Sequence, residues 1–146
     1  MIQMKESKKF GINTTCVHVG EVKDEQFKGA VSPIYTSTSY AFDGVDVKRY
    51  PRYFNTPNQE MLCKKIAALE KTEDALIFGS GMAAISAALF AFLEKGDHVV
   101  VQQVIYGGTY NFIVSEFDKY GIEYSFTESD KVEDFIPLIK ENTKIL

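Results

Sequence analysis

The sequence predicts an α/β fold with a mostly parallel sheet, and two observations carry that prediction. Short apolar runs alternate with helix-like segments from residue 74 onward, which is typical of parallel βαβ units. Two of the runs enter a helix through a glycine-marked turn, in FGSGMAAISAAL at 78–89 and QVIYGGTYNF at 103–112. In a parallel sheet both turns would lie at the carboxyl ends of strands, where open α/β sheets bind their ligands.

Apolar patterns and turn residues predict the individual elements. Strands are expected at 74–78, 98–103 and 122–127, with a further strand beginning at Leu146. Helical spacing predicts a buried helix at 82–93 and an amphipathic helix at roughly 109–120. A last amphipathic segment, VEDFIPLIKEN, contains Pro137, which implies a kink or a late helix start.

The first 55 residues carry scattered glycines and prolines and show no sustained periodicity, so we interpret residues 1–56 as an extended arm. A helix begins directly after this arm. Thr56 is a candidate N-cap, Pro57 suits the first helical position, and Gln59 completes a capping box. The expected buried stripe of this helix is Met61, Leu62, Ile66 and Leu69.

Composition limits the classes of function. The chain has 146 residues, 45% of them hydrophobic, and a formal net charge of −4, so it offers no basic field for nucleic acid or an anionic membrane surface. No apolar run is long enough to span a membrane, and the N-terminus lacks the apolar core of a signal peptide. Two cysteines without a recognisable spacing indicate a reducing compartment, so we expect a cytoplasmic protein.

Several motifs, in a fixed order, resemble the Cys/Met metabolism family of pyridoxal 5′-phosphate (PLP) enzymes, the cystathionine γ-synthase class. The resemblance runs through most of the chain. Its motifs are TTCVHVG at 14–20, AVSPIYTSTSYAF at 30–42, YPRYFN at 50–55, AALEKTEDALIFGSGMAAI at 67–85, GDHVVV at 96–101 and YGGTY at 106–110. The resemblance implies a PLP-dependent transferase-like fold of the aspartate aminotransferase type (fold type I), with helices flanking the sheet.

The resemblance assigns the cofactor phosphate to the amides of Gly81 and Met82 in the SGM turn. This agrees with the physics, because free amides and a helix dipole at a helix N-terminus favour an anion. From the residues alone, Ser80 and Gly81 could equally shape a tight strand-to-helix turn and bind nothing.

Tyr106 matches the tyrosine that stacks on the pyridine ring in this family and, in many members, takes part in proton transfer. Stacking adds about 0.5–1.5 kcal/mol beyond the burial of area, and a phenol needs a lowered pKa to act as a base near neutral pH. Without the resemblance, the sequence favours Tyr106 as a simple amphipathic residue at a sheet edge. Gly108 stands where methionine γ-lyases often carry cysteine, which favours cystathionine enzymes or homoserine sulfhydrylases.

Tyr50 and Arg52 match a pair that reaches from one subunit of the family into its neighbour's site to bind the phosphate. A guanidinium binds phosphate bidentately and a phenol adds a donor, although a loop arginine is more often simply solvated. The resemblance therefore implies a homo-oligomer, a dimer of subunits that share active sites and are commonly paired into a tetramer. The family usually reads Asn, Pro, Thr after this motif, whereas this chain has Asn55, Thr56, Pro57.

The lysine that binds PLP covalently, the acidic partner of its pyridinium nitrogen and the arginine for the substrate carboxylate are not recognisable in this sequence. In the family they lie beyond the part matched here. Lys144 follows a threonine as the family's lysine does, but its polar setting indicates a solvated side chain. We therefore expect residues 57–146 to be the first part of an incomplete PLP-binding large domain.

The predicted function is that of the N-terminal portion of a trans-sulfuration enzyme. Its small amino-acid substrate would be cystathionine or an O-acylated homoserine, and its reaction γ-replacement or elimination at the β- or γ-carbon. The alternatives are a noncatalytic fragment that binds a phosphate-bearing ligand, or one half of a split enzyme. A generic nucleotide-binding domain is disfavoured because GxGxxG and P-loop patterns are absent, and the two histidines give a metal site little support.

Overall fold

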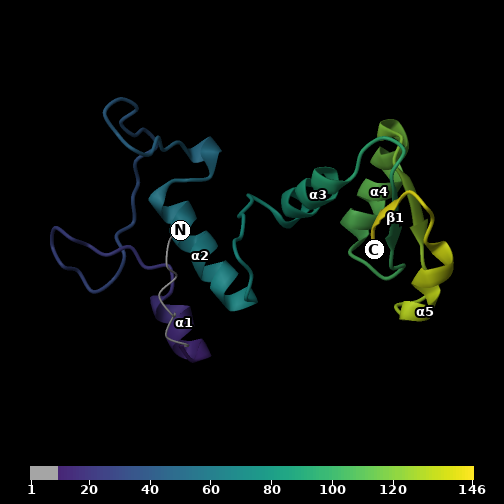
Figure 1. The fold of residues 1–146 in the computed structure, drawn as a ribbon, viewed down its shortest axis with the longest axis horizontal. Helices are drawn as coiled ribbons and strands as arrows, with labels where there is room; N and C mark the ends of the chain where they lie inside the picture. Colours follow the sequence, from purple (N-terminus) through teal and green to yellow (C-terminus); the bar gives the residue numbers. More distant parts are fainter. Residues whose placement is uncertain (1–9) are drawn as a thin grey trace. The chain divides into compact units, whose positions relative to one another are not determined.

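The computed structural model describes residues 10–146 and divides into two compact units. Unit 1 comprises the residues up to Ile77, and unit 2 runs from Phe78 to Leu146. Figure 1 shows the helices α1 and α2 in unit 1 and the small sheet with its helices in unit 2. The two units are described separately below.

Unit 1 consists mainly of irregular backbone around two helices. They are α1 (Ile12–His18) and α2 (Pro57–Glu70), and a single 3₁₀ turn, η1 (Pro51–Tyr53), precedes α2. The arm is therefore not extended throughout, as the sequence predicted, because α1 forms within it. This helix has no buried residue and no side-chain cap, so its stability comes from packing on α2, where Lys65 Nζ donates to the Val17 carbonyl at 3.1 Å.

Gly20 allows the chain after α1 to pass close to α2. Its φ of +80° favours glycine, and a Cβ there would lie 2.4 Å from the carbonyl oxygen of Met61. Any larger residue would therefore separate the two segments. Gly20 is therefore needed both for its own positive φ and for the close approach of the arm to the backbone of α2.

The predicted start of α2 is confirmed, and its predicted buried stripe is wrong. Thr56 is the N-cap and Pro57 the first helical residue, and the Thr56 amide donates to Gln59 Oε1 at 3.1 Å. Within the described residues, however, Cys63 and Ala67 are the buried positions of this helix. Leu62 and Ile66 are exposed, because no described segment covers the face of α2 on which they lie.

Unit 2 is built on a three-stranded parallel sheet in the order β2-β1-β3. The strands are β1 (His98–Val101), β2 (Glu123–Phe126) and β3 (Thr143–Ile145). The helices are α3 (Gly81–Phe92), α4 (Gly107–Tyr120) and the short α5 (Val132–Phe135), which continues into the 3₁₀ turn η2 (Ile136–Leu138). The parallel strand-helix alternation predicted from the sequence is confirmed.

The strand predicted at 74–78 is wrong for this structure. These residues belong to no strand, and Leu76 is 64% exposed. A strand forms only as part of a hydrogen-bonded sheet, and the sheet of the described residues consists of β1, β2 and β3. The strand predicted to begin at Leu146 also differs, because β3 already begins at Thr143 and includes the exposed Lys144.

Pro137 determines how the last helical segment ends. The α-helical part stops at Phe135, and Ile136–Leu138 form a 3₁₀ turn with the proline near its start. The proline therefore coincides with a change from α-helix to 3₁₀ turn, and the amphipathic segment forms one short α-helix and one 3₁₀ turn. A proline in a helix interior removes one hydrogen bond and clashes with the preceding turn.

The core of unit 2 lies between α4 and the sheet. Its buried apolar residues are Leu93, Val99, Ile113, Phe117 and Ile122. The helix α3 was expected to be buried, but none of its residues is. An apolar groove of about 630 Å³ lies beside it, lined by Ile85, Leu89 and residues of β1, α4, α5 and β3.

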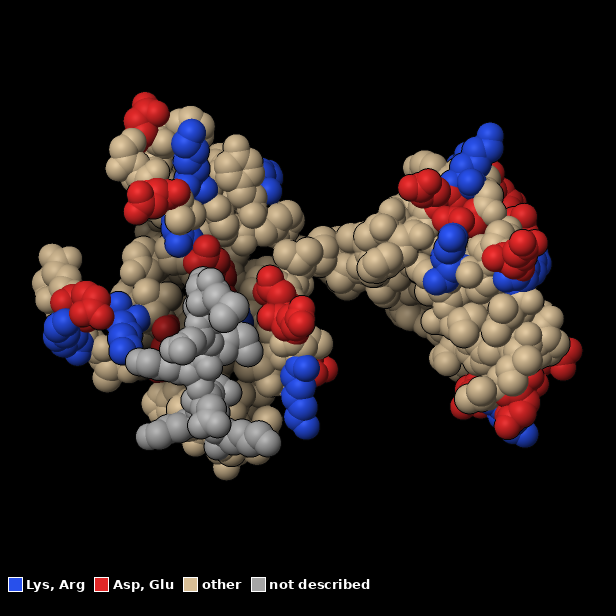
Figure 2. Space-filling view, viewed as in Figure 1, with Lys and Arg blue, Asp and Glu red and all other residues tan. Residues whose placement is uncertain are grey.

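Charged side chains of both signs are interspersed on the face of each unit shown in Figure 2. Among residues 10–146, no helix has the length and apolar character required to cross a bilayer.

His98 joins the three strands of the sheet. Its ring is fully buried, with Nδ1 2.8 Å from Thr143 Oγ1 on β3 and Nε2 2.9 Å from Ser125 Oγ on β2. Burial lowers the pKa of His98, the positive charge of Lys140 lowers this pKa further, and Glu123 opposes the shift. The folded sheet therefore favours the neutral imidazole.

We predict that this histidine makes the sheet sensitive to acid. Because the folded pKa lies below the ordinary value of 6.5, the stabilisation is fully present above pH 6.5 and is lost as the pH falls from there toward the folded pKa. Thermal unfolding measured between pH 8 and 5 should show this loss in the parent. His98→Gln should remove it, and His18→Gln, at the exposed histidine, should retain it. A His98→Gln profile parallel to that of the parent would contradict the prediction.

Candidate functional site

The turn into α3 presents two free backbone amides. Ser80 is the N-cap, and its Oγ accepts from the Ala83 amide at 3.1 Å, while its carbonyl accepts from the Ala84 amide at 3.1 Å. The amides of Gly81 and Met82 have no acceptor among residues 10–146. No atom outside the turn lies within 4 Å of where a Cβ on Gly81 would be. The turn therefore offers donors, the positive end of a helix and open space, which together suit an anion.

The turn into α4 presents Tyr106. This residue directly precedes the helix, and its carbonyl accepts from the Thr109 amide at 2.9 Å and the Tyr110 amide at 3.1 Å. The phenol ring is exposed, and it lies over Gly108, where a Cβ would be 2.5 Å from Tyr106 Cε1. The Tyr106 ring can lie over the first turn of α4 because residue 108 has no side chain.

The two turns are in contact within unit 2. Thr109 Oγ1, in the first turn of α4, lies 3.8 Å from the sulfur of Met82, in the first turn of α3. The α4 helix is also held to the sheet, because the rings of Tyr110 and Phe126 pack with their centroids 4.8 Å apart. The first turn of α3, with Met82, therefore lies against the first turn of α4, which follows Tyr106. Thr109 was not singled out from the sequence, because its contact is with a segment far away in the chain.

Tyr50 and Arg52 lie in unit 1, on the 3₁₀ turn η1. Tyr50 has extended backbone (φ −155°, ψ 139°) and packs edge-on against Tyr53, with 5.4 Å between ring centroids. The guanidinium of Arg52 is exposed and makes no hydrogen bond or ion pair with any residue that the structure describes. It is therefore available to a ligand or to another chain.

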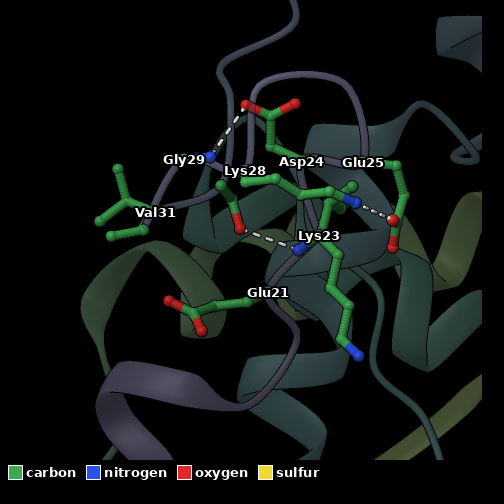
Figure 3. A pocket seen from close by; sticks show the side chains of 10 residues that line it. Glu21, Lys23, Asp24, Glu25, Lys28, Gly29 and Val31 are labelled. Atoms are coloured by element: carbon green, nitrogen blue, oxygen red, sulfur yellow. Dashed lines mark hydrogen bonds and ion pairs between the residues drawn. The ribbon is translucent and has the colours of Figure 1, made fainter.

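A pocket of about 420 Å³ in unit 1 contains none of the predicted site residues. Figure 3 shows it in the loop from Glu21 to Ser32. The Asp24 carboxylate accepts from the amides of Phe27, Gly29 and Gln26, and these bonds lower its pKa. Lys28 pairs with Glu25 at 2.7 Å. Because the backbone and neighbouring side chains satisfy these charges, we assign no ligand to this loop.

Among residues 10–146, no group of three or more His, Cys, Asp or Glu side chains gathers in a way that could hold a metal ion. The donors that the structure offers at α3 are amides, and those at η1 are a phenol and a guanidinium. Both sets suit phosphate chemistry.

An α/β unit whose helix N-terminus suits a phosphate, with a tyrosine at the next strand-to-helix turn, has features of a phosphate-cofactor enzyme. A model of the Cys/Met metabolism PLP-dependent enzyme family matches residues 13–146. The chain belongs to this family.

Similar proteins agree with this assignment. L-methionine gamma-lyase of Fusobacterium nucleatum subsp. polymorphum is 34% identical, over 97% of this chain and 38% of its own. Homocysteine/cysteine synthase of Saccharomyces cerevisiae is 35% identical, over 90% of this chain and 32% of its own. The chain therefore spans between about a third and two fifths of the length of these curated relatives.

Solved structures confirm the predicted fold class. That of metB from Corynebacterium glutamicum matches with a TM-score of 0.86 at 34% identity, over 93% of this chain and 36% of the other. A putative O-acetylhomoserine (thiol)-lyase from Campylobacter jejuni matches with a TM-score of 0.83 at 29% identity, and its structure contains N′-pyridoxyl-lysine-5′-monophosphate.

We predict that Gly108→Ala will displace the ring of Tyr106. The added methyl group would overlap Tyr106 Cε1, so the ring must rotate away from the first turn of α4. If Tyr106 acts on the cofactor, turnover of the complete enzyme should fall roughly tenfold, because its ring is misplaced. Gly107→Ala is the matched control, since no atom lies within 4 Å of its added Cβ. Equal turnover in the two variants would contradict the predicted contact.

Proposed function

We propose that this chain is the N-terminal portion of a PLP-dependent trans-sulfuration enzyme that acts on cystathionine or an O-acylated homoserine. The reaction would be γ-replacement, or elimination at the β- or γ-carbon. The observation that carries the proposal is the contact between the two turns in unit 2, which combines free amides on α3 with the helix that follows Tyr106. The named relatives support the class, since they include a cystathionine beta-lyase and an O-acetyl-L-homoserine sulfhydrylase.

The residues present fit the phosphate of PLP. The amides of Gly81 and Met82 would donate to its oxygens. The Ser80 side chain already accepts from the next amide, that of Ala83. A phosphate at this helix end gains perhaps 0.3–2 kcal/mol from the helix dipole. When bound, PLP supplies an electron sink for the negative charge that remains after a proton leaves the substrate's α-carbon.

Tyr106 is the proposed catalytic residue of this chain. Its exposed ring is free to stack on the pyridine ring of the cofactor, and its phenol oxygen could accept or donate a proton near the substrate. A Cβ at residue 108 would overlap the ring where it now lies, so the cysteine of many methionine γ-lyases would require a different ring position. The glycine therefore favours cystathionine enzymes or homoserine sulfhydrylases over methionine γ-lyases.

Tyr50 and Arg52 are proposed to bind the phosphate in the site of a neighbouring subunit. This role would make residues 1–56 an arm that contacts the neighbour, and residues 57–146 the first part of the PLP-binding large domain. The uncommitted guanidinium of Arg52 supports the assignment. The active assembly would be a dimer with shared sites, commonly paired into a tetramer, and we expect it to act in the cytoplasm.

We predict that Arg52→Ala in the complete enzyme will weaken PLP binding. Losing a guanidinium–phosphate contact costs about 1.5–3 kcal/mol, or roughly ten- to hundredfold in Kd. Titration of the apoenzyme with PLP, followed by the absorbance of the bound cofactor, measures this change. Lys23→Ala removes an exposed positive charge of the same unit and should leave the Kd unchanged. An unaltered Kd for Arg52→Ala would argue against the assigned role.

We predict that Tyr106→Phe will retain PLP but lose turnover. The variant keeps the aromatic ring and removes only the phenol oxygen, so kcat should fall roughly a hundredfold while the Kd for PLP changes little. Steady-state kinetics at saturating PLP provide the measurement. Tyr120→Phe, at an exposed tyrosine near the end of α4, should behave as the parent. Full activity of Tyr106→Phe would leave this residue a packing role only.

A further inference from the structure

The loop that carries Tyr50 and Arg52 is closed by one side chain. Asn55 Oδ1 accepts from the Tyr50 amide at 2.9 Å, and Asn55 Nδ2 donates to the Lys48 carbonyl at 2.8 Å. Both ends of the asparagine amide are therefore used on backbone groups of the same loop. This fixes where the chain enters η1, directly before Arg52.

The same loop is tied to the first turn of α2 by two further side chains. Arg49 Nη1 donates to Glu60 Oε1 at 2.7 Å and also to the backbone carbonyl of Asn55. Gln59 Nε2 donates to the carbonyl of Pro51, the first residue of η1, at 3.1 Å. Arg49 thus connects the loop, the N-terminus of α2 and the residue just before its N-cap.

The turn η1 needs such ties because it is too short to hold itself. Its two internal bonds are Tyr53 N to Tyr50 O at 2.9 Å and Phe54 N to Pro51 O at 3.3 Å. The turn ends at Phe54 with a φ of +56°, a conformation that is costly for a non-glycine residue. A single turn of this kind is marginal without tertiary contacts. The direction of Arg52 therefore depends on contacts outside η1.

We propose that the ion pair between Arg49 and Glu60 is a positioning device that presents Tyr50 and Arg52 to the cofactor phosphate. This inference rests on the proposed function, since it requires that these two residues bind the phosphate. Arg49 and Glu60 do not touch the cofactor themselves. They fix the loop relative to α2, so that the phosphate ligands are already oriented before binding.

The burial of this pair distinguishes it from the lysine–glutamate pair in the same unit. The side chains of Arg49 and Glu60 are 28% and 33% exposed, whereas those of Lys28 and Glu25 are 71% and 76% exposed. An exposed pair between neighbouring residues contributes little. One guanidinium nitrogen of Arg49 donates to two acceptors, Glu60 Oε1 and the Asn55 carbonyl. A lysine in place of Arg49 would have to reach both with a single ammonium group on a more flexible side chain, so it would hold the loop less firmly.

The test uses the complete enzyme and measures the Kd for PLP together with kcat at saturating PLP. We expect Glu60→Ala to weaken PLP binding roughly tenfold, because the phosphate ligands lose their orientation. At saturating PLP, kcat should stay within about twofold, because the reacting groups themselves are intact. Glu60→Gln keeps an acceptor for Arg49 and should restore most of the affinity. Glu25→Ala is the matched control in the exposed pair and should equal the parent.

A double-mutant cycle with Arg52→Ala separates this inference from the proposed function. If Glu60 acts through the loop that carries Arg52, Glu60→Ala should weaken PLP binding less in the Arg52→Ala background than in the parent. If Arg52→Ala alone leaves the Kd unchanged, the proposed function fails. If Arg52→Ala weakens binding but Glu60→Ala does not, only the positioning role fails.

Two further outcomes would also overturn the positioning role. One is a Glu60→Ala enzyme that unfolds at a lower temperature but, when folded, binds PLP as the parent does. The other is strict additivity of the two losses in the cycle, which would mean that Glu60 acts independently of Arg52. Retained affinity in Glu60→Gln alongside lost affinity in both Glu60→Ala and Glu60→Met supports the role, since methionine keeps the packing volume but offers Arg49 no oxygen acceptor.

Discussion

The parallel pairing of β1 with strands on both sides is the constraint on which the order of unit 2 depends. Because β2 and β3 flank β1, the chain must cross over after each strand, and α4 and the α5–η2 segment are those crossovers. His98 extends the pairing beyond the backbone by bridging to hydroxyls on both neighbours. The carboxyl end of β1 leads directly to Tyr106, so the position of the candidate catalytic residue follows from the central strand.

The proposed phosphate donors are of two kinds with different requirements. The amides of Gly81 and Met82 need no side chain to be held in place, because the start of α3 orients them. Arg52 has a flexible side chain and lies in a short turn. The orientation of its guanidinium therefore depends on neighbours such as Arg49 and Asn55, which hold the loop. A helix end supplies partial charge at little entropic cost, whereas a guanidinium supplies full charge only if its loop is organised.

The apolar surfaces of unit 2 are only partly covered by the residues described. None of the residues of α3 is buried, and a groove of about 630 Å³ runs beside it. Apolar surface of this kind contributes to stability only when another segment covers it and removes it from water. The chain covers 38% of the length of its Fusobacterium relative, and in a protein of that length further segments are available to cover such a surface.

The sequence by itself determined the alternation of elements, the start of α2 at Thr56, the glycine-marked turns before α3 and α4, and the family. These features depend on local chemistry, such as capping, proline geometry and turn glycines, which a short stretch of residues contains in full. Tertiary structure alone decided that residues 74–78 form no strand, that Cys63 and Ala67 are the buried positions of α2, that Met82 meets Thr109, and that Arg49 reaches Glu60. Each of these depends on which distant segment arrives as a neighbour, and hydrogen bonding and burial cannot be assigned to a segment before that neighbour is known.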